Sequence, residues 1–193
     1  MKVVNLGEND SVFNQFLYEM RHNQIQQDSM RFRKNMQRMG AIMAYEISKE
    51  LEYKTKEVTT PLGATNARVL SDQLVLATIL RAGLPMQDGM LQIFDQAENA
   101  FVSAYRKYEQ GDKFHIEFEH FSAPQLDDKV MILADPMMAT GASMELSYKG
   151  LLQNGTPKHT HIATIIASRE GVAFIENKLS DVDVSLWVGA IDD

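Results

Sequence analysis

The chain contains no cysteine, which excludes disulfide bonds, thiolate nucleophiles and zinc sites built on thiolates. It also lacks any apolar run near the ~18 residues that a membrane-spanning helix needs. The first ten residues have no apolar core of the length found in signal peptides. We therefore expect a cytoplasmic protein without a membrane partner.

Several common catalytic motifs are absent as well. There is no Gly-x-Gly-x-x-Gly and no Gly-x-Ser-x-Gly, and no loop ends in the Gly-Lys-Ser/Thr of nucleoside-triphosphate sites, which argues against ATP hydrolysis. The histidine pairs His115/His120 and His159/His161 lack the spacing or the nearby carboxylates of a metal site. Structural or surface roles are expected for both pairs, and no metal held by the protein alone.

The composition is that of an ordinary globular domain. Of the 193 residues, 45% are apolar and 23% are charged, so one domain with a substantial core is expected over 1–193. The chain has 26 acidic against 19 basic residues, a formal net charge of −7. That balance argues against a general nucleic-acid partner.

The spacing of apolar residues predicts an α/β fold. Helical spacing near the N-terminus indicates an N-terminal helical segment, with helices over 11–21 and 28–51. From residue 74 onward strands and helices alternate, which predicts a doubly wound, mostly parallel sheet with flanking helices. The expected strands are 74–80, 100–105, 130–135, 162–167 and 182–188, and the expected helices are 83–94, 144–153 and 170–179.

Two segments depart from this alternation. Phe114, Ile116 and Phe118 alternate with polar residues after a Gly111-Asp112 turn, which predicts an antiparallel hairpin within 105–121. This hairpin (106–121) is either a flap over the site or an ordinary edge hairpin. Residues 52–73 show no helical or strand pattern and are expected to be irregular.

The most informative stretch is 130–143. Its apolar run ends on the carboxylate of Asp135, and the loop from Ala139 to Ser143 then supplies small side chains, two hydroxyls and the flexible Gly141 before a helix begins. Backbone N–H groups at a helix start, together with the helix dipole, form a phosphate site. Asp135 is placed to accept hydrogen bonds from sugar hydroxyls, so a phosphorylated sugar is the expected ligand.

Two further strands end in arginine. Arg81 follows one strand and precedes the small residues Ala82 and Gly83, while Arg106 ends the segment Ser103-Ala104-Tyr105-Arg106. The carboxyl ends of parallel strands meet at one edge of a sheet, where ligands bind. A guanidinium holds phosphate through two parallel hydrogen bonds, so both arginines are expected to bind an anion beside the loop.

In this order and spacing, Ile79-Leu80-Arg81-Ala82-Gly83-Leu84, Ser103-Ala104-Tyr105-Arg106 and Asp135-Pro136-Met137-Met138-Ala139-Thr140-Gly141-Ala142-Ser143 resemble the uracil phosphoribosyltransferase family. The resemblance runs from about residue 21 to the last residue. Met138 replaces a common leucine, and Ala142 stands where a second glycine is usual, which requires a negative φ at that position.

The resemblance implies transfer of a phosphoribosyl group from 5-phosphoribosyl 1-pyrophosphate (PRPP) to N1 of uracil. Asp135 would bind the ribose and stabilise the positive charge that develops on it, and Arg81 and Arg106 would hold the pyrophosphate with Mg²⁺. A homodimer or higher homo-oligomer is expected from the family. The PRPP loop would comprise Asp135, Pro136, Met137, Met138, Ala139, Thr140, Gly141, Ala142 and Ser143.

The segment with which the family reads uracil has no counterpart before Asp193, so a truncated chain or a further tail is expected and the uracil-binding residues stay unassigned. Two alternatives remain open. One is an RNA-binding regulator of pyrimidine operons on the same fold. The other is a phosphoribosyltransferase for another base.

Overall fold

The computed structural model describes the backbone of residues 1–108 and 114–193, and the side chains of 1–103 and 119–193. In this part of the chain an eight-stranded sheet runs in the order β1-β10-β9-β7-β4-β5-β6, with β8 beside β9. Every neighbouring pair is parallel except β5 and β6. Its strands are β1 (Lys2–Asn5), β4 (Leu74–Ile79), β5 (Glu98–Tyr108), β6 (Phe114–Ser122), β7 (Val130–Ala134), β8 (Met137–Met138), β9 (His159–Ser168) and β10 (Val184–Asp192).

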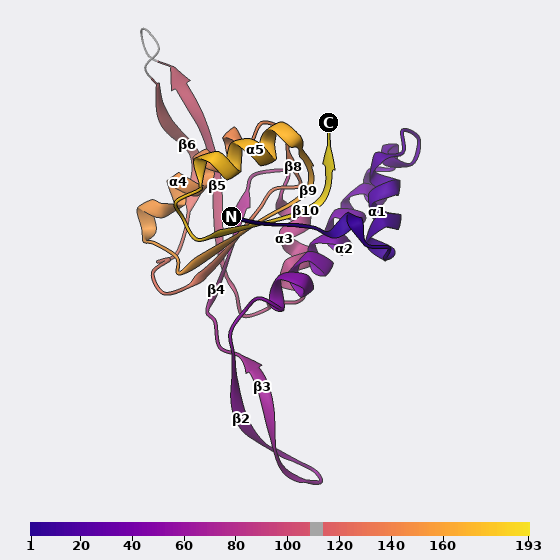
Figure 1. Ribbon diagram of the computed structural model, residues 1–193, viewed down its shortest axis with the longest axis vertical. Helices are drawn as coiled ribbons and strands as arrows, with labels where there is room; N and C mark the ends of the chain where they lie inside the picture. Colours follow the sequence, from indigo (N-terminus) through magenta and orange to yellow (C-terminus); the bar gives the residue numbers. More distant parts are fainter. Residues whose placement is uncertain (109–113) are drawn as a thin grey trace.

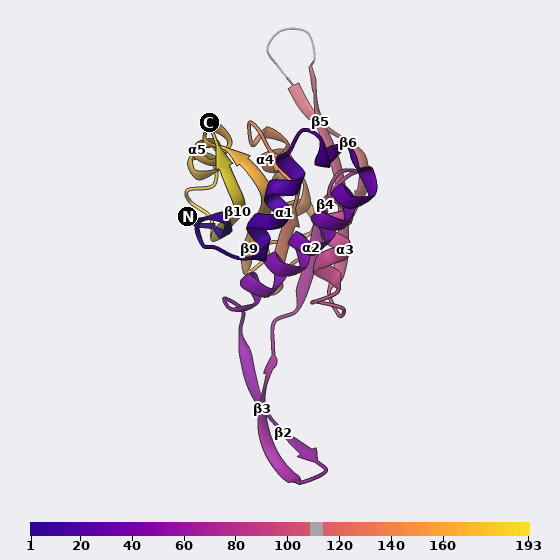
Figure 2. The ribbon, with the colours of Figure 1, turned by 90° about the vertical axis from the view of Figure 1, so that its right-hand side faces the viewer.

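Helices cover both faces of the sheet (Figures 1 and 2). Successive strand residues point to opposite faces, so each buried strand contributes side chains to two cores, one on each face of the sheet. Leu76 and Ile132 pack in the core with the first three helices, whereas Ala77 and Leu133 pack with the last two. The helices are α1 (Val12–Arg21), α2 (Ser29–Ser48), α3 (Leu84–Leu91), α4 (Ala142–Leu151) and α5 (Arg169–Lys178), with short 3-10 turns η1 (Leu6–Glu8), η2 (Ile25–Gln27) and η3 (Leu152–Asn154). The predicted α/β fold is confirmed.

The two N-terminal helices begin where the sequence predicts. Ser11 caps α1 and exchanges hydrogen bonds with Asn14, and the Asp28 carboxylate accepts from the first amides of α2. The backbones of α2 and α3 are in close contact. A Cβ on Gly89 would lie 1.8 Å from the carbonyl oxygen of Gln37, and one on Gly40 would lie 2.2 Å from that of Met86.

The expectation that 52–73 is irregular is wrong. This segment forms an antiparallel hairpin of β2 (Tyr53–Thr60) and β3 (Gly63–Leu70), which projects away from the body of the molecule (Figures 1 and 2). We call it the arm. Most of its residues are exposed on both faces, so the apolar alternation that marks a half-buried strand is missing. The backbone pairs regularly without that pattern.

The second predicted hairpin is present. β5 and β6 pair antiparallel, with a shift in register between Ser103 and Ala104, while the Gly111-Asp112 turn lies outside the described residues. β10 continues to Asp192, four residues beyond the predicted end, and β1, which was not predicted, pairs parallel with it. Among the described residues, no helix is both long and apolar enough to cross a membrane.

Candidate functional site

The structure brings Asp135 and the Arg81 segment to one edge of the sheet. β7 is fully buried and ends at Ala134, directly before Asp135. Its neighbour β4 pairs Thr78 with Ala134, so the chain leaves both strands side by side. Arg81 follows two residues after β4 and is exposed, and the Leu80–Arg81 peptide bond is cis. The predicted meeting of these two strand ends is observed.

Asp135 is a carboxyl group in a poorly solvated place. Burial raises its pKa from the ordinary 3.8 to about 7, although a hydrogen bond from the backbone N–H of Met137 works in the opposite direction. Among the described residues it has no ion-pair partner that would hold it ionised. A cationic ligand, or a ligand on which positive charge develops, would therefore favour the ionised form of Asp135.

The loop after Asp135 leads into α4 through Gly141. Gly141 has φ of 74° and occupies the N-cap position, a left-handed conformation that glycine adopts without steric cost. Ala142 already lies in the helix and its φ is negative, as its tolerance requires. The Thr140 hydroxyl accepts a hydrogen bond from the Ala142 N–H at 3.4 Å. Apart from that bond, the first N–H groups of α4 have no acceptor within the helix.

A cavity of about 140 Å³ lies in this loop. Its lining consists of Asp135, residues 137–141, Ser143 and Met144. Most of the residues predicted for the PRPP loop therefore surround one space. Pro136 and Ala142 are outside that lining: Pro136 is buried with its carbonyl accepting hydrogen bonds from Ile165 and Ile166, and Ala142 begins the helix. The volume and the helix N-terminus suit one phosphate group.

A second, more apolar cavity of about 550 Å³ adjoins the first and shares Asp135 and Met137 with it. Its other walls come from Ala82, Pro136 and Ile166 and from the N-terminal helices, which contribute Met20, Arg21, Gln26, Phe32 and Met36. Met20 and Met36 also belong to the buried core. No signal in one sequence separates a methionine that fills a core from one that lines a cavity.

Arg106 is the predicted site residue that the structure places only in part. It lies on β5, and its backbone is in register with Ile116 of β6. Its side chain is outside the described residues, and so are those of His115 and most of the predicted flap. β5 pairs with β4 only as far as Val102, opposite Ile79, so Arg106 lies four residues beyond the last pair with the strand that leads to Arg81.

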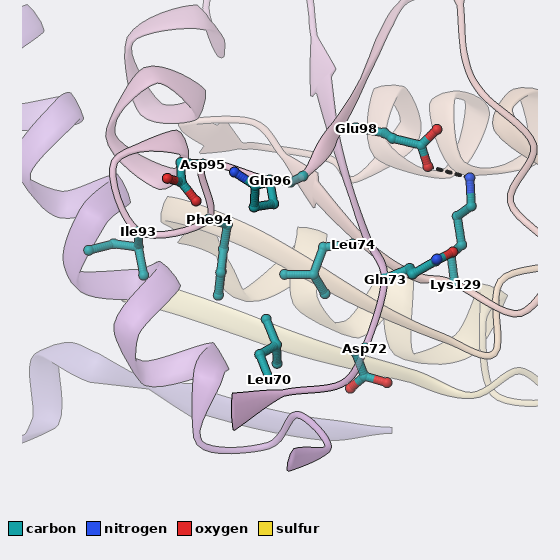
Figure 3. Close-up of a pocket in the computed structure, with 11 residues that line it drawn as sticks. Leu70, Asp72, Gln73, Leu74, Ile93, Phe94, Asp95, Gln96, Glu98 and Lys129 are labelled. Atoms are coloured by element: carbon teal, nitrogen blue, oxygen red, sulfur yellow. Dashed lines mark hydrogen bonds and ion pairs between the residues drawn. The ribbon is translucent and has the colours of Figure 1, made fainter. Parts of the chain in front are cut away.

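A larger cavity, of about 670 Å³, lies at the opposite edge of the sheet, where the parallel strands begin (Figure 3). Leu70, Leu74 and Phe94 form its apolar wall, and Glu98 and Lys129 pair at its rim. It contains none of the predicted site residues. Size alone therefore does not identify the functional cavity.

Metal-binding groups are sparse. Among the described residues, no three His, Asp or Glu side chains are grouped so as to hold a metal ion. His161 instead accepts a hydrogen bond at Nδ1 from the Trp187 indole N–H at 3.1 Å. Burial lowers the pKa of His161 to about 4, so this imidazole is neutral near pH 7 and has a structural role.

Comparisons with known proteins point in one direction. The family model described as "Uracil phosphoribosyltransferase" matches residues 9–193. A uracil phosphoribosyltransferase of Porphyromonas gingivalis is 52% identical over 192 residues, covering 100% of this chain and 88% of the relative. The protein of that name from Pyrococcus furiosus is 34% identical over 168 residues, covering 86% of this chain and 71% of the relative.

Solved structures agree on the fold. The AQ2163 protein of Aquifex aeolicus superposes with a TM-score of 0.82 at 29% identity, over 98% of this chain and 87% of that one. A hypoxanthine phosphoribosyltransferase of Staphylococcus aureus superposes with a TM-score of 0.52 at 13% identity, over 83% of this chain and 74% of that one. At such low identity the second likeness concerns the fold alone.

Proposed function

The chain belongs to the uracil phosphoribosyltransferase family, and from this membership we propose that it transfers the phosphoribosyl group of PRPP to uracil, giving UMP and pyrophosphate. The observation that carries the proposal is the arrangement at the end of β7, where a poorly solvated carboxyl group adjoins a phosphate-sized cavity at a helix N-terminus.

The loop binds the 5′-phosphate of the donor. Thr140, Gly141 and Ser143 surround the small cavity and precede or begin α4, whose dipole favours an anion there. Hydroxyls and backbone amides supply the hydrogen bonds, and the loop geometry is formed before the donor arrives. Such preorganised donors stabilise a bound anion at low cost in reorganisation.

Asp135 acts on the sugar. In the reaction the bond from ribose C1 to pyrophosphate breaks, a bond from C1 to uracil N1 forms, and the N1 proton leaves. Positive charge develops on the ribose between these events. Asp135 binds the ribose hydroxyls, and its carboxylate stabilises that charge in a partly water-excluded place. Catalysis of this kind depends on positioning and electrostatics and requires no protein nucleophile.

Arg81 and Arg106 hold the departing pyrophosphate. An exposed guanidinium beside the end of β4 is suited to a phosphate that enters from solvent. Mg²⁺ prefers oxygen ligands and usually combines one or two carboxylates with substrate phosphates. The Asp135 carboxylate and the pyrophosphate oxygens fit that pattern, and the ion would neutralise charge on the leaving group.

The apolar cavity takes the base. It shares Asp135 and Met137 with the phosphate cavity, so a ring placed in it lies next to the sugar site. Its walls of Phe32, Met36 and Pro136 match the flat faces of a pyrimidine. The hairpin of β5 and β6 serves as a flap that keeps water from the activated sugar.

The protein works as one domain and as a homodimer or a higher homo-oligomer. The arm supports this proposal, because an isolated two-stranded hairpin is marginally stable in water. Its tip residue Leu62 is 100% exposed and Val58 is 40% exposed. A second copy that covers the arm would bury these side chains.

The proposal is tested by incubating the protein with uracil, PRPP and Mg²⁺ and measuring UMP. UMP formation is expected, and its absence at saturating substrates contradicts the proposal, whereas RNA binding without UMP would favour the regulator.

Arg106→Ala should raise the KM for PRPP about 10- to 100-fold and leave that for uracil nearly unchanged. Ser143→Ala should act in the same direction with a smaller effect, and a wild-type profile would contradict its place in the phosphate loop.

A further inference from the structure

Ser168 connects the phosphate loop to the next helix. It is the last residue of β9 and the N-cap of α5. Its hydroxyl donates a hydrogen bond to the carbonyl oxygen of Ala139 at 2.5 Å and accepts one from the N–H of Gly171 at 2.9 Å. One side chain therefore caps a helix and also holds a backbone carbonyl of the loop.

The bond to Ala139 fixes the direction of a neighbouring amide. In a planar trans peptide the C=O of one residue and the N–H of the next point in opposite directions. Because the Ala139 carbonyl points to Ser168 and α5, the N–H of Thr140 points away from α5. Both residues line the phosphate cavity. The orientation of this amide matters because a donor that can rotate freely stabilises an anion poorly.

The loop rests on this junction at further points. Met138 of β8 is in register with Ala167 of β9. A Cβ on Gly171 would lie 2.5 Å from the Ala139 carbonyl oxygen, so the first turn of α5 and the loop are in direct backbone contact. This close approach places the Ala139 carbonyl oxygen against the first turn of α5. Ser168 supplies the polar bond that settles its direction.

We propose that Ser168 is a positioning residue for the donor phosphate, acting through the Ala139–Thr140 peptide and making no contact with the substrate itself. The inference rests on the proposed function, since it concerns the same phosphate cavity. It assigns the end of β9 and the start of α5 a part in donor binding, beyond the predicted loop residues.

The test compares the loss of the Ser168 bonds with the loss of a helix cap alone. Ser168→Ala removes both bonds and adds no charge near the phosphate cavity. Ser168→Thr keeps both bonds. Ser11→Ala removes the cap of α1, at a distance from the loop, and is the control for a lost cap alone.

Affinity is measured by calorimetry with PRPP and with ribose 5-phosphate, neither of which needs uracil. Ser168→Ala is expected to weaken both about three- to tenfold, the range for one lost hydrogen bond, with a fall in melting temperature similar to that of Ser11→Ala. In turnover the KM for PRPP should rise by the same factor while kcat changes less than about twofold. Ser168→Thr and Ser11→Ala should keep wild-type affinity.

Wild-type affinity in Ser168→Ala would overturn the proposal, and so would a loss of affinity in Ser11→Ala equal to that in Ser168→Ala. The outcome is independent of the acceptor. If the wild type binds PRPP and forms no UMP, the proposed function fails, while the comparison among the Ser168 variants still decides the positioning role.

Discussion

The two edges of the parallel sheet differ in whether a poorly solvated carboxylate has a cationic partner. At the edge where strands begin, charged side chains are paired with one another: Lys129 with Glu98, and Lys158 with Glu52 and Asp72. At the edge where strands end, Arg21 pairs with Asp192, whereas the poorly solvated Asp135 has no such partner among the described residues, and its pKa is about 7. The first edge also has the larger cavity.

We infer that this difference separates a structural edge from the edge proposed to bind the substrates. Where a charge already has a partner, a ligand must break that pair before it gains a new one. Burial makes ionisation of the Asp135 carboxyl group unfavourable in the free protein. A ligand that supplies positive charge would stabilise the ionised carboxylate. The unsatisfied electrostatics, rather than the cavity volume, mark the site.

The largest effect is expected for Asp135→Asn, which removes the charge that distinguishes the functional edge. The kcat/KM for PRPP should fall about 10²- to 10³-fold, as when one preorganised electrostatic group is lost from an active site. A kcat/KM within a few-fold of the wild type would contradict the role of Asp135.

At high pH the same variant should be more stable than the wild type. Because the folded pKa of Asp135 lies above its ordinary 3.8, the folded protein keeps a proton that the unfolded chain has released, and stability falls as pH rises from about 4 to about 7. Urea unfolding at pH 8 should find Asp135→Asn more stable by on the order of 2–4 kcal/mol, with a smaller difference at pH 4. Equal stability at both pH values would mean that Asp135 is well solvated.

Arg81→Ala tests whether an exposed charge at the functional edge matters more than one at the structural edge. The KM for PRPP should rise about 10- to 100-fold, since a charge-assisted bond to phosphate is lost, and the KM for uracil should hardly change. Lys129→Ala removes a cation at the other edge and should leave both values unchanged. Equal effects of the two substitutions would remove the distinction between the edges.

The smallest effect on activity is expected for Lys158→Met. The Asp72 side chain is 2% exposed, so it loses its cation while it stays buried, and the free energy of unfolding should fall by about 1–3 kcal/mol. The kcat/KM should stay within about twofold of the wild type. Lys129→Met is the matched control, because Glu98 is 49% exposed and such pairs contribute below about 1 kcal/mol. Loss of activity in either variant would show that this edge takes part in function.

The central part of the site could be predicted because its signals are local. A buried strand, a carboxylate, small loop residues and a helix start follow one another within 130–143, and the structure has them in that order. The starts of α1 and α2 were predictable for the same reason, since Ser11 and Asp28 are capping residues beside the helices they cap.

Features that depend on distant partners could not be predicted. β1 has four residues, and it is a strand because it pairs with β10 at the far end of the sequence. The arm has no apolar face to signal its strands. The apolar cavity requires Phe32 and Met36 to face Pro136, a contact that no spacing within one helix encodes. The pKa of Asp135 depends on burial by all of these surroundings.

The backbone contact between α2 and α3 has a consequence for how this enzyme family can change its specificity. α2 supplies Phe32 and Met36 to the apolar cavity, and α3 begins just after the Arg81 segment. Gly40 and Gly89 leave no soft side chain between the two backbones to absorb a shift. A mutation that tilts α2 to admit a different base to the cavity proposed for it would therefore also move Arg81, the arginine proposed to hold pyrophosphate. Acceptor choice and leaving-group release are thus expected to be inherited together, and new specificities are easier to reach by changing single side chains in the cavity wall.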